Sequence, residues 1–426
     1  MDNIDLLIIG GGASGLMAAG LAAEKGLKVL VLEKMNQVGR KLSITGKGRC
    51  NLTNDSELQD FVEVVQPDGR FLYSSLSSFS NYDLLNLFAR IGVEATLERG
   101  GRYFPVNNSA PEVTKKLHQW CLKKGVSFKM NFKVSKLLVT KGKMQGVQGN
   151  ENIPGDSKFQ VVETIIANRV LLCTGGYSYP ATGSNGDGHR MLKQIGHQIS
   201  DCVPSLVPLE IDRKLTSQLI GLELKNINAT IVEFGDVVAE EFGELHFINT
   251  GISGPIILTL SRTIVPLLKA GKSLKVKIDF KPGLSPDKLD ARLARDLSDR
   301  GGETIASILR GLMLKKLIPV CLQETKLKAD MLGAQITSVE RKRLHKFLKE
   351  FVIRIKGYRP FSEAIITKGG VLTSEINQKT MESKVVEGLY IAGEILDLDG
   401  PTGGYNLQIS FSTANAAAQD IISKGS

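Results

Sequence analysis

The segment from Ile4 to Glu33 constrains the fold most strongly. It reads IDLLIIGGGASGLMAAGLAAEKGLKVLVLE, an apolar run, a glycine turn, a stretch of small residues and a second apolar run. Continuous apolar runs of this length are typical of parallel strands that are covered on both faces. We therefore predict a strand at 4–9, a helix at about 14–25 and a strand at 28–32, which form one βαβ unit of a Rossmann-like α/β fold.

The turn carries the spacing GxGxxG at Gly10, Gly12 and Gly15. In dinucleotide-binding folds the first glycine permits the tight turn, the second lets the backbone approach a pyrophosphate, and the third packs helix on strand. The helix start, with Ala13 and Ser14, offers unpaired N–H groups to the phosphates. The motif alone can be an accidental glycine turn, so its context decides.

Glu33 ends the second strand and supplies that context. A carboxylate at this position accepts hydrogen bonds from the ribose hydroxyls of an adenosine and repels a 2′-phosphate. The combined pattern predicts a site for FAD or NAD(H).

The stretch GRKLSITGKGRCNLTN at 39–54 favours FAD, because it has the glycines, cations and hydroxyls of a chain that crosses a pyrophosphate towards a flavin. The alternative is a solvated basic loop. Cofactor contacts are expected from Lys34, Gly39, Arg40, Lys41, Ser43, Thr45, Gly46, Arg49, Cys50 and Asn51.

The C-terminal region repeats this logic with a strand at 389–392, a glycine-rich loop and a helix at about 406–422. In flavoproteins of this class the carboxylate after the strand meets the ribityl chain, and the helix N-terminus points at the flavin N1 and C2 carbonyl. The expected contacts are Gly393, Glu394, Gly403, Gly404, Asn406 and Leu407.

Two internal segments complete the expected site. The sequence VLLCTGGYSYPATGSNGDG brings Thr174, Gly175 and Gly176 beside the cofactor, and the backbone of Val134 is expected to touch the adenine. We expect FAD to be bound tightly and non-covalently. No second GxGxxG follows a strand, so a dedicated nicotinamide-binding fold is not expected, and NAD(P)H could bind only transiently over the flavin as an electron donor.

These motifs, with GGRYFP, GELHFINTGISGP, TKGGV and GLYIAGEILDLDGPTGGYNLQ, resemble the BaiN/YhiN-like flavoprotein family of NAD(P)/FAD-dependent, aminoacetone-oxidase-type oxidoreductases. The resemblance spans the chain and implies an FAD domain built from both chain ends with an inserted β-rich unit and a helical unit. We expect the FAD domain at 1–203 and 355–426, a barrel-like β-rich insertion at 204–284 and a helical insertion at 285–354. Alternating apolar residues up to Asp279 and helical periodicity from Pro286 support the insertion independently.

One position departs from the family pattern. The family commonly has Thr-His where this chain has Ile248-Asn249, and its histidine is displaced to His246. A role of the family histidine therefore does not carry over, and His246 is expected to be structural.

The candidates for catalysis lie where the first loop should reach the flavin, at Arg49, Cys50 and Asn51. The surrounding cations should lower the pKa of the Cys50 thiol, which could then act as a general acid. The alternative is that Cys50 packs as a small residue under the flavin.

The resemblance implies three kinds of substrate: a steroid enone, a ribosomal RNA uridine and a small amine. The first two share hydride addition to a C=C conjugated to a carbonyl, which is the preferred reaction; an amine oxidase using oxygen and a non-catalytic flavin-binding assembly protein are the alternatives. The net charge of +10 favours an anionic partner. Contact with ribosomal RNA is expected from Arg341, Lys342, Arg343, Lys346 and Lys349.

The remaining features predict a cytoplasmic protein without a metal site. Five cysteines, an odd number and never spaced CxxC, indicate reduced thiols and neither zinc ligands nor a disulfide framework. The uncharged run at 6–23 contains glycines and follows two acids, so it predicts a strand-turn-helix and no membrane segment.

Overall fold

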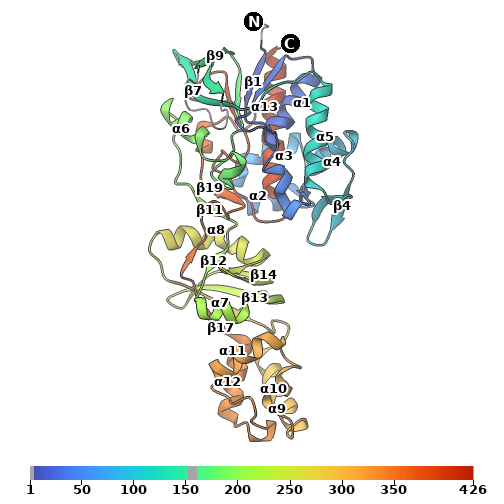
Figure 1. Ribbon diagram of the computed structural model, residues 1–426, viewed down its shortest axis with the longest axis vertical. Coiled ribbons are helices and arrows are strands. Elements are labelled where there is room, and N and C mark those ends of the chain that lie inside the picture. The colour runs from blue at the N-terminus through green and yellow to red at the C-terminus, as the bar shows by residue number, and fades with distance from the viewer. Residues whose placement is uncertain (1–3, 152–160, 426) are drawn as a thin grey trace. The chain divides into compact units, whose positions relative to one another are not determined.

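The computed structural model describes residues 4–151 and 161–425, and the chain divides into two compact units. The first unit contains Met1–Pro204 and Ala364–Ser426, and the second contains Ser205–Glu363. Both ends of the chain therefore build the first unit (Figure 1).

A five-stranded parallel sheet forms the centre of the first unit, in the order β20-β10-β1-β2-β6. Its strands are β1 (Leu6–Ile9), β2 (Val29–Leu32), β6 (Ser127–Lys129), β10 (Val170–Leu172) and β20 (Leu389–Ile391). All residues of β1, β10 and β20 are buried, as expected for a sheet covered on both faces. The α/β fold and the first βαβ unit are thus confirmed.

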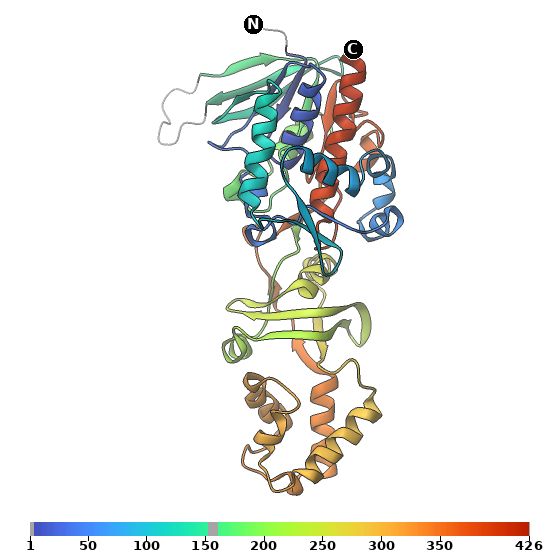
Figure 2. The ribbon, with the colours of Figure 1, turned by 90° about the vertical axis from the view of Figure 1, so that its right-hand side faces the viewer.

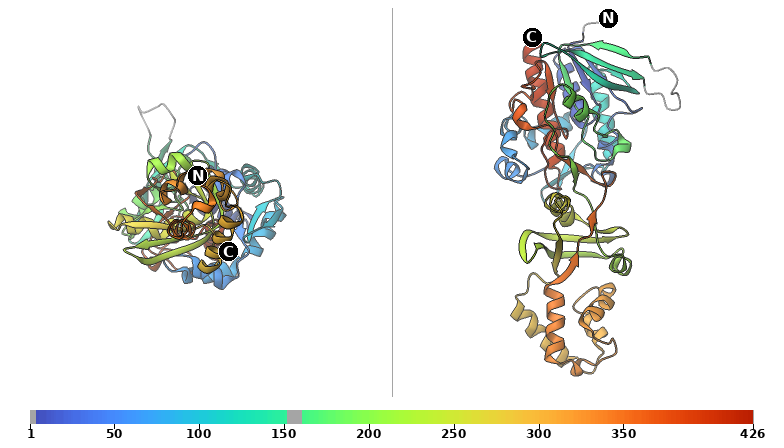
Figure 3. Two further views of the ribbon diagram at one scale, coloured as in Figure 1. Left: turned by 90° about the horizontal axis from the view of Figure 1, so that it is seen from below. Right: turned by 90° about the vertical axis from the view of Figure 1, so that its left-hand side faces the viewer.

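Helices α1 (Ala13–Glu24) and α13 (Tyr405–Gly425) run side by side against this sheet (Figure 2). Their close approach follows from small buried residues such as Ala18, Ala22 and Ala417. Helix α5 (Ala110–Lys123) packs beside α1, where a Cβ on Gly20 would lie 2.1 Å from the Trp120 ring. The end of α13 lies at the same end of the unit as the start of β1 (Figure 3).

Three small sheets and several helices complete the first unit. The sheets have the orders β3-β5-β4, β7-β8-β9 and β11-β19. Their strands are β3 (Thr53–Asn54), β4 (Ala95–Glu98), β5 (Arg102–Pro105), β7 (Phe132–Thr140), β8 (Lys143–Glu151), β9 (Glu163–Ile166), β11 (Val203–Ser205) and β19 (Ile366–Lys368). The helices are α2 (Leu58–Val64), α3 (Tyr73–Ser78), α4 (Asn81–Arg90) and α6 (Asp187–Gln194), with a 3-10 segment η1 at Leu42–Gly48.

The second unit contains a seven-stranded antiparallel sheet in the order β17-β16-β13-β14-β15-β12-β18. The strands are β12 (Leu209–Glu210), β13 (Glu223–Glu233), β14 (Asp236–Ile248), β15 (Gly251–Ser253), β16 (Leu274–Asp279), β17 (Phe351–Arg354) and β18 (Gly357–Tyr358). The helices are α7 (Arg213–Leu219), α8 (Pro255–Lys269), α9 (Pro286–Asp299), α10 (Ile305–Leu309), α11 (Ile318–Thr325) and α12 (Ser338–Lys349).

One apolar core joins the sheet and the helices of the second unit. It contains Ile231 and Val276 from the sheet together with Leu293, Leu344 and Phe347 from the helices. The chain returns to the first unit between Glu363 and Ala364. The boundaries at 284 and 354 that the sequence suggests stay predictions.

Within the described residues, no helix is long and apolar enough to cross a membrane. The same residues contain no group of three His, Cys, Asp or Glu side chains placed to hold a metal ion.

Candidate functional site

The glycine turn after β1 is tightly packed at two positions and open at the third. A Cβ on Gly10 would lie 2.5 Å from the Cys173 carbonyl oxygen, and one on Gly15 would lie 1.9 Å from that of Gly10. A Cβ on Gly12 would meet no atom within 4 Å. Gly12 is the N-cap of α1, which has no side-chain cap and no acid in its first turn. The open space and the uncapped helix start fit the pyrophosphate of FAD.

Glu33 turns its carboxylate towards this glycine turn. One oxygen accepts a hydrogen bond of 2.7 Å from the Gly11 N–H, and the other accepts one of 2.9 Å from the Met35 N–H. Burial raises the pKa of Glu33, while these two hydrogen bonds and the charge of Lys34 act in the opposite direction. The carboxylate retains acceptor capacity for two ribose hydroxyls.

The cations that follow Glu33 differ in whether they already interact with other groups of the protein. The ammonium of Lys34 donates to Asn185 and Asp187, each at 2.6 Å, and so holds the start of α6. Arg40 is half-buried and has no partner in the described part of the chain. Arg40 is therefore a cation of this segment that is available to a phosphate.

The hydroxyls of the same loop face the protein. Ser43 donates to the Gly39 carbonyl and lies 3.0 Å from the Thr114 hydroxyl, and Thr45 donates to the Leu42 carbonyl at 2.7 Å. A Cβ on Gly39 would lie 2.3 Å from the Thr114 methyl group. These contacts hold the loop against α5, and direct bonds from Ser43 and Thr45 to FAD stay predictions.

A polar network joins this loop to the end of β20. Lys41 Nζ lies 2.5 Å from Glu394 Oε2 and 2.6 Å from the Ser178 hydroxyl. The other oxygen of Glu394 accepts from Ser178 at 2.6 Å and from the Thr367 N–H at 2.9 Å. Four distant segments therefore meet at the carboxylate that is expected to face the ribityl chain.

Arg49 is fixed in a partly exposed position. Its guanidinium lies 4.0 Å from the centre of the Phe104 ring, forms an ion pair with Glu98 and donates to Asn108 at 2.7 Å. The plane of the guanidinium is thus held by three groups, with its remaining donors available to a ligand.

Cys50 contradicts the expected thiol chemistry. Its side chain is 0 % exposed, and burial raises its pKa to about 12. The prediction of a lowered pKa was wrong because the effect of burial outweighs that of the hydrogen bond with the Thr45 side chain, which lowers the pKa. Cys50 also has φ +62, which is unusual for a residue with a side chain. Its role as a proton donor stays a prediction.

Asn51 ties the loop to the start of α13. In the orientation that satisfies its amide, the nitrogen donates to the carbonyls of Thr53 and Tyr103 at 3.1 and 3.2 Å. The oxygen accepts from the Gly404 N–H at 3.1 Å. Asn51 therefore accepts the hydrogen bond of the Gly404 N–H, the group that we expected to approach the flavin.

The loop before α13 is fixed by side chains from the first turn of α13. Asn406 donates to the carbonyls of Gly400 and Pro401 and accepts from the Gly400 N–H. The Tyr405 hydroxyl lies 2.7 Å from the hydroxyl of Ser56. Gly403 and Gly404 have φ +119 and +100, and a Cβ on Gly404 would lie 2.4 Å from the Thr53 backbone.

The loop after β10 contains a buried polar atom that the protein does not satisfy. Thr174 Oγ1 has no hydrogen-bond partner among the described residues. Its neighbours Gly175 and Gly176 leave no space for side chains, because Cβ atoms there would lie 2.8 and 2.3 Å from other hydroxyls. Val134 is buried in β7. Cofactor contacts of these residues stay predictions.

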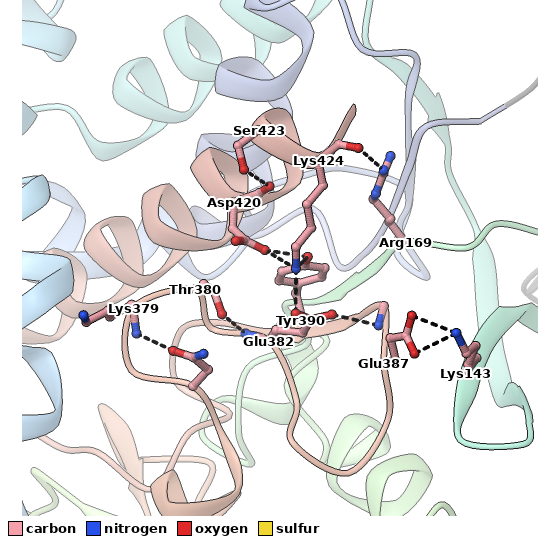
Figure 4. Close-up of polar contacts among 12 residues, drawn as sticks. Lys143, Arg169, Lys379, Thr380, Glu382, Glu387, Tyr390, Asp420, Ser423 and Lys424 are labelled. Carbon is pink, nitrogen blue, oxygen red and sulfur yellow. Dashed lines mark hydrogen bonds and ion pairs between the residues drawn. The ribbon is translucent and has the colours of Figure 1, made fainter. Parts of the chain in front are cut away.

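The other end of α13 is held by a polar cluster (Figure 4). Lys424 Nζ lies 2.7 Å from carboxylate oxygens of Glu382 and Asp420 and 3.1 Å from the Tyr390 hydroxyl, which itself donates to Asp420 at 2.7 Å. Arg169 donates to the Lys424 carbonyl at 2.5 Å. Since Tyr390 is on β20, this cluster fixes α13 along the strand that precedes Glu394.

Comparison of the sequence with known families gives a match to the HI0933-like protein Rossmann domain over residues 4–420. The chain belongs to this family. A relative from Clostridium scindens, named 3-dehydro-bile acid delta(4,6)-reductase, is 32% identical over 415 residues, which cover 97% of each chain. A ribosomal RNA dihydrouridine synthase from Haemophilus influenzae is 30% identical, with 97% of this chain and 98% of the relative covered.

Solved structures support the fold of this HI0933-like chain. The 3-ketosteroid delta1-dehydrogenase of Sterolibacterium denitrificans aligns with a TM-score of 0.56 at 14% identity and full coverage of both chains. The 3-ketosteroid-delta4-(5alpha)-dehydrogenase of Rhodococcus jostii aligns with a TM-score of 0.53 at 15% identity, covering 98% of this chain and 96% of the other. Together with the family, these findings identify an FAD-dependent oxidoreductase.

Sequence reasoning missed Ser178, Thr367 and the α13 anchor. Ser178 and Thr367 stand in the recognised stretches CTGGYSYP and TKGGV, but the patterns do not show that both contact Glu394. Asn249 is exposed at the end of β14, and His246 is partly buried in that strand, 3.8 Å from Glu244. Neither gives a sign of catalytic use.

Proposed function

We propose that this FAD enzyme reduces a carbon–carbon double bond conjugated to a carbonyl group. The observation that carries the proposal is that two relatives, each aligned over 97% of this chain, are named a 3-dehydro-bile acid delta(4,6)-reductase and a ribosomal RNA dihydrouridine synthase. Both names denote saturation of a C=C. None of the relatives reported above is named an oxidase, so the amine oxidase is the less supported alternative. Bound FAD, reduced beforehand by an electron donor, would supply the hydride, and an acid or water would supply the proton.

The protein's part is to bind and orient, and to stabilise charge. Addition of hydride to the far carbon of the double bond moves negative charge to the carbonyl oxygen. We assign stabilisation of that charge to Arg49, because its cationic guanidinium is fixed over Phe104 and is 38% exposed. Cys50 as the acid that protonates the near carbon is less supported, since the enclosed thiol has no exposed surface.

RNA as the substrate would require a cationic surface. Only some of the five cations predicted to contact RNA are free of acidic partners. Arg341 is engaged with both carboxylate oxygens of Asp290 at 3.0 and 3.2 Å, and Lys349 is engaged with Asp279 and two carbonyls. Lys342, Arg343 and Lys346 remain exposed on α12. Three of the five predicted residues could thus contact phosphates.

Anaerobic single-turnover reduction tests the proposal. Dithionite-reduced enzyme is mixed with a 4-en-3-one steroid or with a uridine-containing ribosomal RNA fragment, and flavin reoxidation is followed spectroscopically. Reoxidation with a product that has gained two hydrogens is expected for at least one of them. Failure of both, with peroxide formed from small amines in air, would contradict the proposal. The same assay with NADH or NADPH and oxidised enzyme tests whether a nicotinamide is the electron donor.

A further inference from the structure

The small sheet β3-β5-β4 of the first unit, whose edge strand β4 is labelled in Figure 1, gathers polar side chains on one face. Arg102 on β5 is directly opposite Asn54 on one side and Glu98 on the other. Because side chains alternate along a strand, Phe104 lies on the same face as these three residues. This face therefore combines a cation, an acid, an amide and an aromatic ring.

Asn54 joins this face to the glycine loop where the flavin is expected. Asn54 is buried, and its amide nitrogen donates to the Gly403 carbonyl at 3.0 Å. In a directly opposed pair the Cα atoms are about 5 Å apart, so Arg102 is one strand away from the residue that contacts this loop.

The guanidinium of Arg102 is held in place but has no acidic partner. Its Nε donates to the Arg99 carbonyl at 2.9 Å. Within the described chain, no carboxylate lies within ion-pair distance of Arg102, and its two terminal nitrogens donate to no other residue. Arg102 is half-buried, so it is partly accessible. The N–H donors of its terminal nitrogens are therefore available to a ligand.

The acids near Arg102 interact with other groups. Opposite charges at directly opposed positions of an antiparallel pair usually attract each other, but the Glu98 carboxylate forms its ion pair with Arg49. Asp55 accepts a hydrogen bond of 3.0 Å from the Tyr103 hydroxyl, and alternation places Tyr103 on the other face of the sheet. Neither acid neutralises Arg102.

Arg49 and Arg102 lie against the same aromatic ring. The guanidinium carbon of Arg49 is 4.0 Å from the centre of the Phe104 ring, and that of Arg102 is 5.9 Å from it. At most roughly 10 Å therefore separates the two charges, which is about one Debye length at 0.1 M salt. Since Glu98 offsets only one of them, an anion bound at Arg102 would neutralise the remaining charge.

We propose that Arg102 binds an anionic group of the substrate, a carboxylate or a phosphate, while Arg49 stabilises the charge that develops on the carbonyl oxygen. The planar fork of a guanidinium matches the paired oxygens of both groups. This inference rests on the proposed function, to which it adds that the conjugated substrate carries a permanent negative charge remote from the reacting carbons. Arg102 would determine specificity and take no part in the transfer of hydride or proton.

Isothermal titration calorimetry on the oxidised, FAD-loaded enzyme measures binding without turnover. A 4-en-3-one steroid with a side-chain carboxylate is compared with its methyl ester, and uridine 5′-monophosphate is compared with uridine. The charged member of at least one pair is expected to bind about 10- to 100-fold more tightly than the neutral member. The pair that shows this difference identifies the group as a carboxylate or a phosphate.

Variants of Arg102 link this preference to the guanidinium. Arg102→Gln is expected to abolish the preference and to leave the affinity for the neutral ligand and for FAD unchanged. Arg102→Lys should retain part of the preference, because lysine keeps the charge but not the fork. The control Arg99→Gln removes the same charge from an exposed neighbour and should change the affinity for the charged ligand less than about 2-fold.

Single-turnover reoxidation of the reduced flavin separates binding from catalysis. Arg102→Gln should raise the half-saturating concentration of the charged substrate about 10- to 100-fold and leave the limiting rate within about 3-fold of the wild-type rate. A lowered limiting rate at an unchanged half-saturating concentration would overturn the inference, because the guanidinium would then act on the reacting group.

Equal binding of charged and neutral ligands by the wild type would overturn the inference, as would equal losses in Arg102→Gln and Arg99→Gln. Reoxidation of the flavin by a substrate without any preference for charge would overturn the inference and leave the proposed function intact. A preference for charge that is lost in Arg102→Gln, with no substrate reoxidising the flavin, would instead contradict the proposed function alone.

Discussion

Lys41 Nζ lies 2.5 Å from Glu394 Oε2, although the two residues are 353 positions apart. The pair joins the loop after the first βαβ unit to the carboxyl end of β20. Both side chains are about four-fifths buried, so the interaction is less screened than a surface ion pair. Each partner fixes the position of the other at the point where the ribityl chain of FAD is expected.

Lys41→Met is expected to weaken FAD binding by about 10-fold, because Glu394 keeps its charge but loses its cation. Titration of apoprotein with FAD, followed by flavin fluorescence, measures the loss. The control Lys47→Met removes the same charge from an exposed site of the same loop and is expected to change affinity little. Equal effects in both variants would show that the pair has no special role.

The pH dependence of FAD affinity is expected to depend on Glu33. Burial raises the pKa of Glu33. The carboxylate accepts hydrogen bonds from the ribose hydroxyls better than the protonated form does. Affinity should therefore fall as pH is lowered through this raised pKa. Glu33→Gln should bind FAD about 10- to 100-fold more weakly at neutral pH and lose most of this pH dependence.

The stability of the apoprotein should change with pH in the opposite direction to FAD affinity, through the same group, Glu33. A raised pKa means that the folded apoprotein holds this proton more tightly than the unfolded chain does. The contribution to the free energy of unfolding is therefore present at low pH and lost as pH rises through the folded pKa. Urea unfolding of wild type and Glu33→Gln over a pH series measures this contribution. A free energy of unfolding that rises with pH in the wild type and not in the variant would contradict the expectation.

The cysteines are expected to differ sharply in reactivity. Cys202 is partly exposed, whereas Cys50, Cys121, Cys173 and Cys321 are buried and burial raises their pKa. A thiol reagent should therefore modify one cysteine quickly in native enzyme and all five after unfolding. Cys202→Ser should abolish the fast phase. A fast reaction that persists and disappears in Cys50→Ala would show that the loop opens.

The sequence was sufficient for the parts of the fold that depend on local pattern. The strands at β1 and β2, the glycine turn and α13 follow from apolar runs, glycine spacing and small residues, and each is observed within a few residues of its expected position. Glu33 and the glycines are predictable as a group because one short βαβ unit positions them all.

Properties that depend on tertiary packing were not predictable in the same way. The cations around Cys50 suggested a reactive thiol, but burial dominates its pKa. The sequence places Arg341 and Lys349 in a basic stretch, but each has an acid from another segment as its partner. A linear pattern shows which charges are near in sequence, and not which ones fold together.

The anchor at the end of α13 is expected to stabilise the first unit. Tyr390→Phe removes a hydroxyl that is bonded to Asp420 and Lys424 in a buried position, which should cost about 1 kcal/mol and a few degrees in Tm. Thermal unfolding measures the change. Since the cluster is at the end of α13 away from Gly404, the flavin spectrum should stay unchanged; an altered spectrum would show that the anchor also positions the cofactor.

Asn51 gives the sharpest test of how the site is assembled. Asn51→Asp keeps the size of the side chain and the acceptor for the Gly404 N–H, but it places a negative charge against the carbonyls of Thr53 and Tyr103. The loop before α13 should loosen, with FAD affinity lower by about 10- to 100-fold, because two donated hydrogen bonds are replaced by repulsion. The control Asn107→Asp is expected to leave FAD affinity unchanged, since the Asn107 side chain accepts a hydrogen bond from the Ser109 N–H, which a carboxylate can also accept. Fluorescence titration with FAD and limited proteolysis at residues 400–404 measure both effects. Unchanged affinity and unchanged cleavage in Asn51→Asp would mean that the glycine pair is held by the packing of α13 alone.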